Sequence, residues 1–320
     1  MTPNVKQLDL RLLIKISKLY YEQGLTQQQI SDRLHLSRPK ISRLLQQAHD
    51  HGLIQISVTT PPGSYTDLEQ QLETQFDLRE AVVVAVEAGA SQEVIARELG
   101  LAAAQYLYRT LENNDVIGVS WGLTLNGMVN ALRPFEAQNT QIVQIIGGLG
   151  APEAEVHATD IAQRFARLLG GKLTLMPSPG VVQNAQAQIA MMSDRQVQRA
   201  FEMFSEITLA FVGIGVPRAT SVVLRDGSIM SPEQLAHVLV LGAVGDICLR
   251  FFDADGLPVP SAFDPLVIGI TLAQLQQIGR VIAVAGGRDK LAAVRGALRG
   301  RLIHVLITDD QLAGELVEQG

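Results

Sequence analysis

The stretch LTQQQISDRLHLSRPKISRLLQQAHDHGLI, residues 25–54, decides the fold of the first part of the chain. Thr26 is placed as the N-cap of a helix over residues 27–34, and a three-residue turn follows at once. Ser37 is placed as the N-cap of a second helix, and Pro39 lies in its first turn, where a missing N–H costs nothing. Two short helices joined by a tight turn are typical of a helix-turn-helix.

The second of these helices has an apolar face and a basic face. Ile41, Leu44, Leu45 and Ala48 recur at helical spacing, which predicts one buried stripe. The opposite face is rich in cationic and hydroxyl side chains, which bind phosphates and the edges of bases in a major groove. Together with the start of the first helix, this face supplies the predicted DNA contacts, which are Gln27, Gln28, Ser37, Arg38, Lys40, Ser42 and Arg43.

The residues around this pair of helices complete a small domain. A helix with apolar residues at helical spacing precedes the pair and ends near Gly24, and residues 53–58 alternate like a strand, as the wing of a winged helix does. We therefore expect a DNA-binding domain over residues 1–58 and a linker over residues 59–66, which contain the breaker cluster TTPPGS. The alternative is a solvated helical hairpin whose arginines are ordinary surface residues.

Charge is divided unequally along the chain. The 320 residues carry a formal net charge of −6. Residues 1–60 hold eight Lys and Arg against four Asp and Glu, a net charge of +4, which leaves −10 for the remainder. A basic head on an acidic body concentrates positive potential where phosphates dock and repels DNA elsewhere.

Composition excludes several classes of protein. With 47% hydrophobic and 18% charged residues, the chain is typical of a globular protein. It has neither a long uninterrupted apolar run nor a signal-peptide core. Its single cysteine, Cys248, rules out an intrachain disulfide and a thiolate zinc site. We expect a cytoplasmic protein without membrane contact, metal or cofactor.

Beyond the linker, residues 67–320 alternate between apolar strand-like runs and amphipathic helical stretches. The predicted strands are residues 81–86, 116–120, 141–146, 173–176, 209–214, 247–252, 281–285 and 304–308. This alternation predicts an α/β domain with a doubly wound, largely parallel sheet and helices on both faces. Residues 253–256 supply turn chemistry for one hairpin near the edge of the sheet.

In such sheets, ligands bind beyond the carboxyl ends of the strands. Residues 119–124 form a strand-loop-helix whose free N–H groups, with the hydroxyls of Ser120 and Thr124, make an anion site. Glycine pairs end three further predicted strands, and Lys290 follows the last of them, where its ammonium can contact a phosphate. Each glycine pair alone is more typical of a tight turn. Taken together, these loops favour a phosphorylated ligand.

Residues 25–54 and five later stretches resemble the SorC family of sugar-responsive transcription regulators. The later stretches are GVSWGLT, QIIGGLG, VGIG, GAVGDICLRFFDADG and VAGGRDKLAAVRGAL, so the resemblance covers nearly the whole chain. The family's large domain is similar to phosphosugar isomerases such as glucosamine-6-phosphate deaminase. The resemblance therefore implies an effector-binding and oligomerisation domain over residues 67–320.

The resemblance also implies roles for individual residues and for partners. The residues implied to hold a phosphate are Ser120, Gly122, Thr124 and Lys290. Gly147, Gly148 and Gly215 would let the backbone approach a sugar, and Asp246 would take one of its hydroxyls. Members of the family form homodimers or homotetramers, and a sugar or sugar phosphate alters their hold on a double-stranded DNA operator.

Two other functions stand as alternatives to a sugar-responsive regulator. One is an active phosphosugar isomerase with an appended DNA-binding domain, which would need converging acid and base groups. The loop after Gly215 lacks the Asp-Gly-His triplet of the deaminases, and Asp246 is nearly the only strand-end carboxylate, so we expect no enzyme. The other is a DNA-binding protein whose large domain only oligomerises, against which the glycine loops and Lys290 argue.

Overall fold

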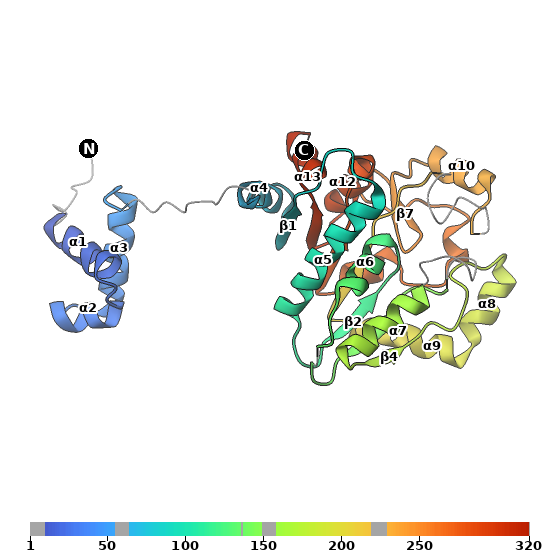
Figure 1. Ribbon diagram of the computed structural model, residues 1–320, viewed down its shortest axis with the longest axis horizontal. Coiled ribbons are helices and arrows are strands. Elements are labelled where there is room, and N and C mark those ends of the chain that lie inside the picture. The colour runs from blue at the N-terminus through green and yellow to red at the C-terminus, as the bar shows by residue number, and fades with distance from the viewer. Residues whose placement is uncertain (1–9, 55–63, 136, 149–157, 219–228, 320) are drawn as a thin grey trace, which may run out of the picture. The chain divides into compact units, whose positions relative to one another are not determined.

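The computed structural model describes residues 10–54, 64–135, 137–148, 158–218 and 229–319. The chain divides into two compact units, Met1–Pro62 and Gly63–Gly320, which we call the head and the body (Figure 1). None of the helices in these described ranges is long and apolar enough to cross a membrane.

The head is a bundle of short helices. They are α1 (Leu10–Ser17), the π-helical turn η1 (Lys18–Glu22), α2 (Gln27–Leu34) and α3 (Arg38–Asp50). Their buried residues are Ile16, Leu19, Ile30, Ile41 and Leu45. The prediction of two helices around a tight turn is therefore confirmed, and the first helical segment ends just before Gly24, whose φ of 67° favours glycine.

The two predicted N-cap residues of the head differ in whether their side chains bond to the helix. Thr26 forms a capping box with Gln29: its hydroxyl accepts a bond of 3.2 Å from the Gln29 amide, and the Gln29 side chain accepts one of 2.9 Å in return. Ser37 occupies the N-cap position of α3, as predicted, although its side chain caps no amide. The predicted wing lies mostly outside the described residues.

The body contains a parallel sheet of seven strands. The strands are β1 (Glu80–Val84), β2 (Val116–Val119), β3 (Gln141–Gln144), β4 (Lys172–Thr174), β5 (Leu209–Val212), β8 (Arg280–Val284) and β9 (Val305–Asp309). Their order is β1-β9-β8-β5-β2-β3-β4, and every neighbouring pair is parallel. The predicted doubly wound sheet is therefore confirmed.

Helices cover both faces of this sheet. On one face lie α5 (Gln92–Thr110), α6 (Leu123–Ala131) and α7 (Ala158–Leu169), whose buried residues include Leu99, Leu125 and Phe165 (Figure 1). The other face packs against α4 (Thr66–Phe76), α9 (Arg195–Glu202), α12 (Leu291–Arg299) and α13 (Asp310–Glu318). Three further helices of the described body are α8 (Ala185–Ser193), α10 (Pro232–Val240) and α11 (Leu272–Gln277). Neither α4, α8 nor α9 was predicted from the sequence.

One predicted strand is wrong. Residues 247–252 do not form a single strand of the main sheet but belong to an antiparallel hairpin of β6 (Gly245–Ile247) and β7 (Arg250–Phe252). The turn between them consists of Cys248 and Leu249, with φ angles of 53° and 59°. Residues without special turn chemistry rarely adopt this left-handed conformation, so the apolar run gave no sign of a turn. The turn predicted at residues 253–256 does form, with Asp253 accepting two backbone N–H bonds.

The strand order defines a switch point in the sheet. From β2 the chain proceeds outward through β3 and β4, whereas β5, β8 and β9 lie on the other side of β2. Neighbouring strands with connections leading in opposite directions leave a crevice beyond their carboxyl ends, which is where ligands bind in open α/β sheets. In this body the crevice lies beyond β2 and β5, with β8 next to β5.

Candidate functional site

The basic face of α3 is free of intramolecular charge pairing. Arg38, Lys40, Ser42 and Arg43 are all exposed, while Ile41 on the opposite side is fully buried. Within the described part of the chain, none of the three cationic side chains forms an ion pair within 4.0 Å. Their charges are therefore available to a polyanion such as a nucleic acid.

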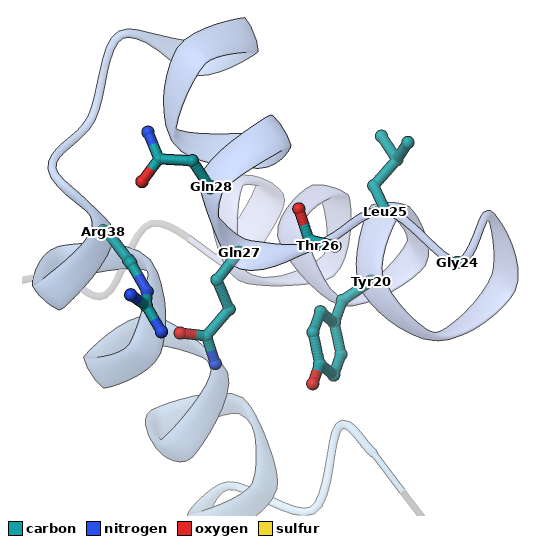
Figure 2. A pocket seen from close by; sticks show the side chains of 7 residues that line it. All are labelled: Tyr20, Gly24, Leu25, Thr26, Gln27, Gln28 and Arg38. Carbon is teal, nitrogen blue, oxygen red and sulfur yellow. The ribbon is translucent and has the colours of Figure 1, made fainter.

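A hollow of about 610 Å³ lies beside the start of α2. Its lining residues are Tyr20, Gly24, Leu25, Thr26, Gln27, Gln28 and Arg38. Figure 2 shows the guanidinium of Arg38 and the amide of Gln27 pointing into the same space, with the Tyr20 ring nearby. Gln28 points elsewhere, and its amide donates a 2.9 Å bond to Asp32. The hollow therefore gathers several donors that suit one backbone phosphate, and Tyr20 is a lining residue that its place in an apolar helical pattern did not reveal.

In the body, the predicted hydroxyl residues lie at the crevice and each already makes one bond. Ser120, which follows β2, is almost completely buried, and its oxygen accepts a 3.2 Å bond from the thiol of Cys248 in the β6–β7 turn. The Thr124 hydroxyl donates a 2.8 Å bond to the Val284 carbonyl at the end of β8. Thr124 can therefore only accept a further hydrogen bond, whereas Ser120 retains its proton for a ligand.

Gly122 lies at the N-terminus of α6, where no side chain caps the helix. Its φ of 129° is one that side-chain-bearing residues rarely adopt, and a Cβ there would face open space. An uncapped helix N-terminus presents unpaired N–H groups and positive potential, which together attract anions.

The backbones of Asp246 and Gly215 are hydrogen-bonded to each other, and the Asp246 carboxylate packs against Gly215. They exchange two backbone hydrogen bonds of 2.9 and 3.1 Å, and a Cβ on Gly215 would lie 2.1 Å from an Asp246 carboxylate oxygen. The other carboxylate oxygen accepts a 3.1 Å bond from the Leu249 amide. Burial raises the pKa of Asp246 to about 6, against the opposing effects of the Leu249 amide and of Lys290.

Lys290 ends the short 3-10 turn Arg288–Lys290 after β8. Burial lowers the pKa of its ammonium, while the nearby carboxylates of Asp289, Asp246 and Asp309 oppose that shift. Among the residues that the structure describes, no carboxylate lies within 4.0 Å of this ammonium. Since β8, β5 and β2 are neighbours, Lys290, Gly215 and the Ser120 loop share one edge of the sheet. Lys290 and Asp246 thus interact electrostatically without forming an ion pair.

Sequence reasoning missed two carboxylates at this edge, so the expectation that Asp246 is nearly alone is wrong. Asp309 ends β9, is 2% exposed, and accepts bonds from the Gly287 and Leu312 amides. Asp289 forms an ion pair with Arg218 and accepts a 3.3 Å bond from Gln92. An aspartate directly before the predicted helix at residue 310 was a signal for Asp309, because aspartate is a preferred N-cap.

The backbone amides of Gly147 and Gly148 are hydrogen-bonded to other residues of the body. Their amides donate to the carbonyls of Ile268 and Ser178, at 2.9 and 2.8 Å, and a Cβ on Gly147 would lie 2.5 Å from the Pro179 carbonyl oxygen. Neither glycine therefore has a free N–H for a ligand. Residues 149–157, which follow them, lie outside the described ranges.

The segment that receives the Gly147 amide is held by one buried side chain. Arg250, in β7, is 6% exposed and donates to the carbonyls of Asp264, Val267, Gly269 and Ile270. It also forms an ion pair of 3.2 Å with the Asp264 carboxylate. Arg250 thus ties the β6–β7 hairpin to residues 264–270, which in turn pair with the end of β3.

No group of three or more His, Cys, Asp or Glu side chains in the described ranges has the arrangement of a metal site.

Comparison with known proteins identifies the family. Residues 61–318 match the family described as "Putative sugar-binding domain". The chain is 34% identical over 307 residues to the deoxyribonucleoside regulator of Bacillus subtilis, covering 96% of this chain and 97% of that protein. It is 32% identical to the sorbitol operon regulator of Klebsiella pneumoniae, covering 97% and 98%.

A solved structure agrees with these sequence relatives. The crystal structure of the full-length sorbitol operon regulator SorC from Klebsiella pneumoniae matches with a TM-score of 0.74 and 31% identity, over 98% of this chain and all of that one. The match extends through both the head and the body, as the sequence matches do. The chain therefore belongs to the SorC family of sugar-binding transcriptional regulators.

Proposed function

We propose that this chain is a DNA-binding transcription regulator whose hold on a double-stranded operator is controlled by a sugar phosphate. The observation that carries the proposal is the crevice at the switch point, where the uncapped N-terminus of α6 follows β2 and Lys290 follows β8, the two strands that flank β5. Positive potential from two sources at one edge favours an anionic ligand. The unpaired basic face of α3 supports DNA as the second partner.

Each residue of the crevice has a distinct proposed role. Ser120, Lys290 and the uncapped amides after Gly122, which include the N–H of Thr124, bind the phosphate. Asp246, which Gly215 allows to approach, accepts a hydroxyl of the sugar. Gly147 and Gly148 have no free amide for the ligand, and they support the crevice by packing against the neighbouring loops.

The head supplies the proposed DNA contacts. Lys40, Ser42 and Arg43 lie on the exposed side of α3, and Ser37 has a free hydroxyl at its start. Arg38, Gln27 and Gln28 line the hollow beside α2, which fits a backbone phosphate that positions the head.

The proposed domain boundaries are residues 1–58 for DNA binding, 59–66 for the linker and 67–320 for effector binding and oligomerisation. A homodimer or homotetramer would present two heads to two half-sites, and a ligand that favours one subunit arrangement would change their spacing. We propose no catalytic activity. The buried carboxylate of Asp309 accepts two amide N–H bonds and that of Asp246 accepts one, which suits structural or binding roles better than proton transfer.

Thermal unfolding of the full chain with sugar phosphates and their unphosphorylated counterparts tests this proposal. A ligand at 100 times its dissociation constant stabilises the native state by about 2.7 kcal/mol, which shifts the melting temperature measurably. A shift with one or two phosphorylated sugars and none with their parent sugars is expected. A shift with the parent sugar alone would contradict the phosphate role of Lys290. Conversion of the ligand during incubation, followed by NMR, would contradict the absence of catalysis.

A further inference from the structure

Two consecutive carboxylates at the junction of β9 and α13 bind partners in different parts of the body. Asp309 accepts a 2.6 Å bond from the Gly287 amide, in the loop that leads to Lys290, and a 2.9 Å bond from the Leu312 amide. Its carboxylate is buried, and a Cβ on Gly286 would lie 2.6 Å from one of its oxygens. The loop at Gly286 and Gly287, which leads to Lys290, therefore packs against Asp309.

Asp310 faces the segment that connects the body to the head. One oxygen of its carboxylate accepts a 3.1 Å bond from the Tyr65 hydroxyl, and the other accepts a 3.0 Å bond from the Val86 amide. Tyr65 is the N-cap residue of α4, which is the first helix of the body. The start of α4 is therefore tied to the residue that follows Asp309.

The rest of α4 is fixed to the same end of the sheet. β1 is an edge strand paired only with β9, so one side of its backbone has no strand partner. Glu69 and Glu73 of α4 accept bonds of 2.9 Å from the Val83 and Ala81 amides on that side. These bonds and the pairing of β1 with β9 make α4, β1 and β9 one connected unit.

We propose that Asp309 and Asp310 are positioning residues that couple the crevice loop to α4, the helix from which the chain continues to the DNA-binding head. The inference rests on the proposed function, because it assumes that a ligand binds next to Lys290. A ligand that draws the loop at Gly287 toward itself changes the bond to Asp309, and the adjoining peptide carries that change to Asp310 and Tyr65. Coupling of this kind is reciprocal, so a change at Tyr65 also alters the loop.

Reciprocity allows the coupling to be tested without a ligand. Tyr65→Phe removes only the hydroxyl that Asp310 accepts. In the full-length chain, the hydrogen exchange of the Gly287 and Leu312 amides should become roughly fivefold faster, the factor that one lost hydrogen bond of about 1 kcal/mol represents. Tyr108→Phe is the matched control, because its hydroxyl likewise donates a 3.1 Å bond, to the Arg133 carbonyl in a different part of the body. Equal exchange at Gly287 and Leu312 in the wild type and Tyr65→Phe would overturn the coupling.

Inorganic phosphate, compared with chloride at equal ionic strength, separates this inference from the proposed function. The expected result is slower exchange both in the loop at Gly287 and in α4 of the wild type, with the α4 effect lost in Tyr65→Phe and kept in Tyr108→Phe. Slower hydrogen exchange in the loop alone would support the anion site and overturn the coupling. If neither phosphate nor any sugar phosphate slows hydrogen exchange in the loop, the proposed anion site is wrong. The comparison without ligand then still decides whether Tyr65 and Gly287 are coupled.

Discussion

The head and the body arrange their charges in opposite ways. In the head, Arg38, Lys40 and Arg43 are exposed and have no carboxylate partner in the described ranges. In the body, charged groups such as Asp309 and Arg250 are buried and bonded to the backbone. Exposed, unpaired cations suit a large polyanion that approaches from solvent, whereas buried groups with fixed partners shape a site for a small ligand.

The comparison predicts that a charge change in one unit affects only the ligand of that unit. Lys290→Met should weaken the binding of a sugar phosphate by roughly 10- to 100-fold, because a hydrogen bond to a charged group contributes about 1.5–3 kcal/mol. Isothermal titration with a phosphorylated sugar from the thermal screen measures this loss, and DNA affinity without ligand should not change.

Lys172→Met is the matched control, since Lys172 is exposed on β4 and is the only other lysine after residue 60. If both variants lose ligand affinity equally, general electrostatics rather than a local site explains binding, and the contrast between the two units disappears.

Arg43→Ala tests the head in the same way. A duplex selected from random sequence by the wild-type chain should bind about 1–3 kcal/mol more weakly if Arg43 pairs with a base edge. If Arg43 contacts a phosphate instead, the salt dependence of binding should decrease by about one unit of slope. Fluorescence anisotropy over a range of salt concentrations distinguishes the two. Arg199→Ala, an exposed arginine on α9, should leave DNA binding unchanged.

Asp246 should make the stability of the body depend on pH. Its folded pKa of about 6 lies above the ordinary value of 3.8, so the folded chain holds more protons between these values and loses stability as the pH rises through them. Relative to Asp246→Asn, which cannot titrate, the wild-type free energy of unfolding should fall by about 2–2.5 kcal/mol between pH 4 and pH 7. Urea unfolding at both pH values measures it. A difference that is constant with pH would show that burial does not perturb this carboxyl.

Thr26→Ala should have the smallest effect and should be confined to the head. Losing the capping box at α2 should cost about 1 kcal/mol of head stability. Hydrogen exchange of the α2 amides measures this, because it resolves the head from the body. Faster exchange in the body as well would mean that the two units unfold together.

Signals carried by neighbouring residues predicted much of the fold. Thr26 caps α2 as the sequence predicted, and Gln29, three residues later, completes a capping box that was not predicted. The parallel sheet also followed from local alternation of apolar strands and helices. Ser120, Gly215 and Lys290 were predicted because they follow strands, and parallel strands bring such loops to one edge. The role of Asp246 was implied by the resemblance to the family.

The features that the sequence did not predict depend on contacts between distant residues. Cys248 and Leu249 adopt left-handed angles although neither favours them, since Ser120 holds the turn from outside the hairpin and Asp246 holds it from within. Asp309 meets the Gly287 amide 22 positions away, and no local pattern indicates that pairing. Tyr20 resembled an ordinary apolar helix position because its neighbours in the hollow come from other helices.

Arg250 has a consequence for how this protein tolerates mutation. Its four hydrogen bonds end on backbone carbonyls of residues 264–270, so they do not depend on which side chains those residues carry. Substitutions in that segment that keep its apolar packing should therefore leave these bonds in place, whereas even Arg250→Lys should destabilise the body, because one ammonium cannot reproduce the planar fork of donors. The backbone path of residues 264–270 is thus kept by a single residue elsewhere in the chain.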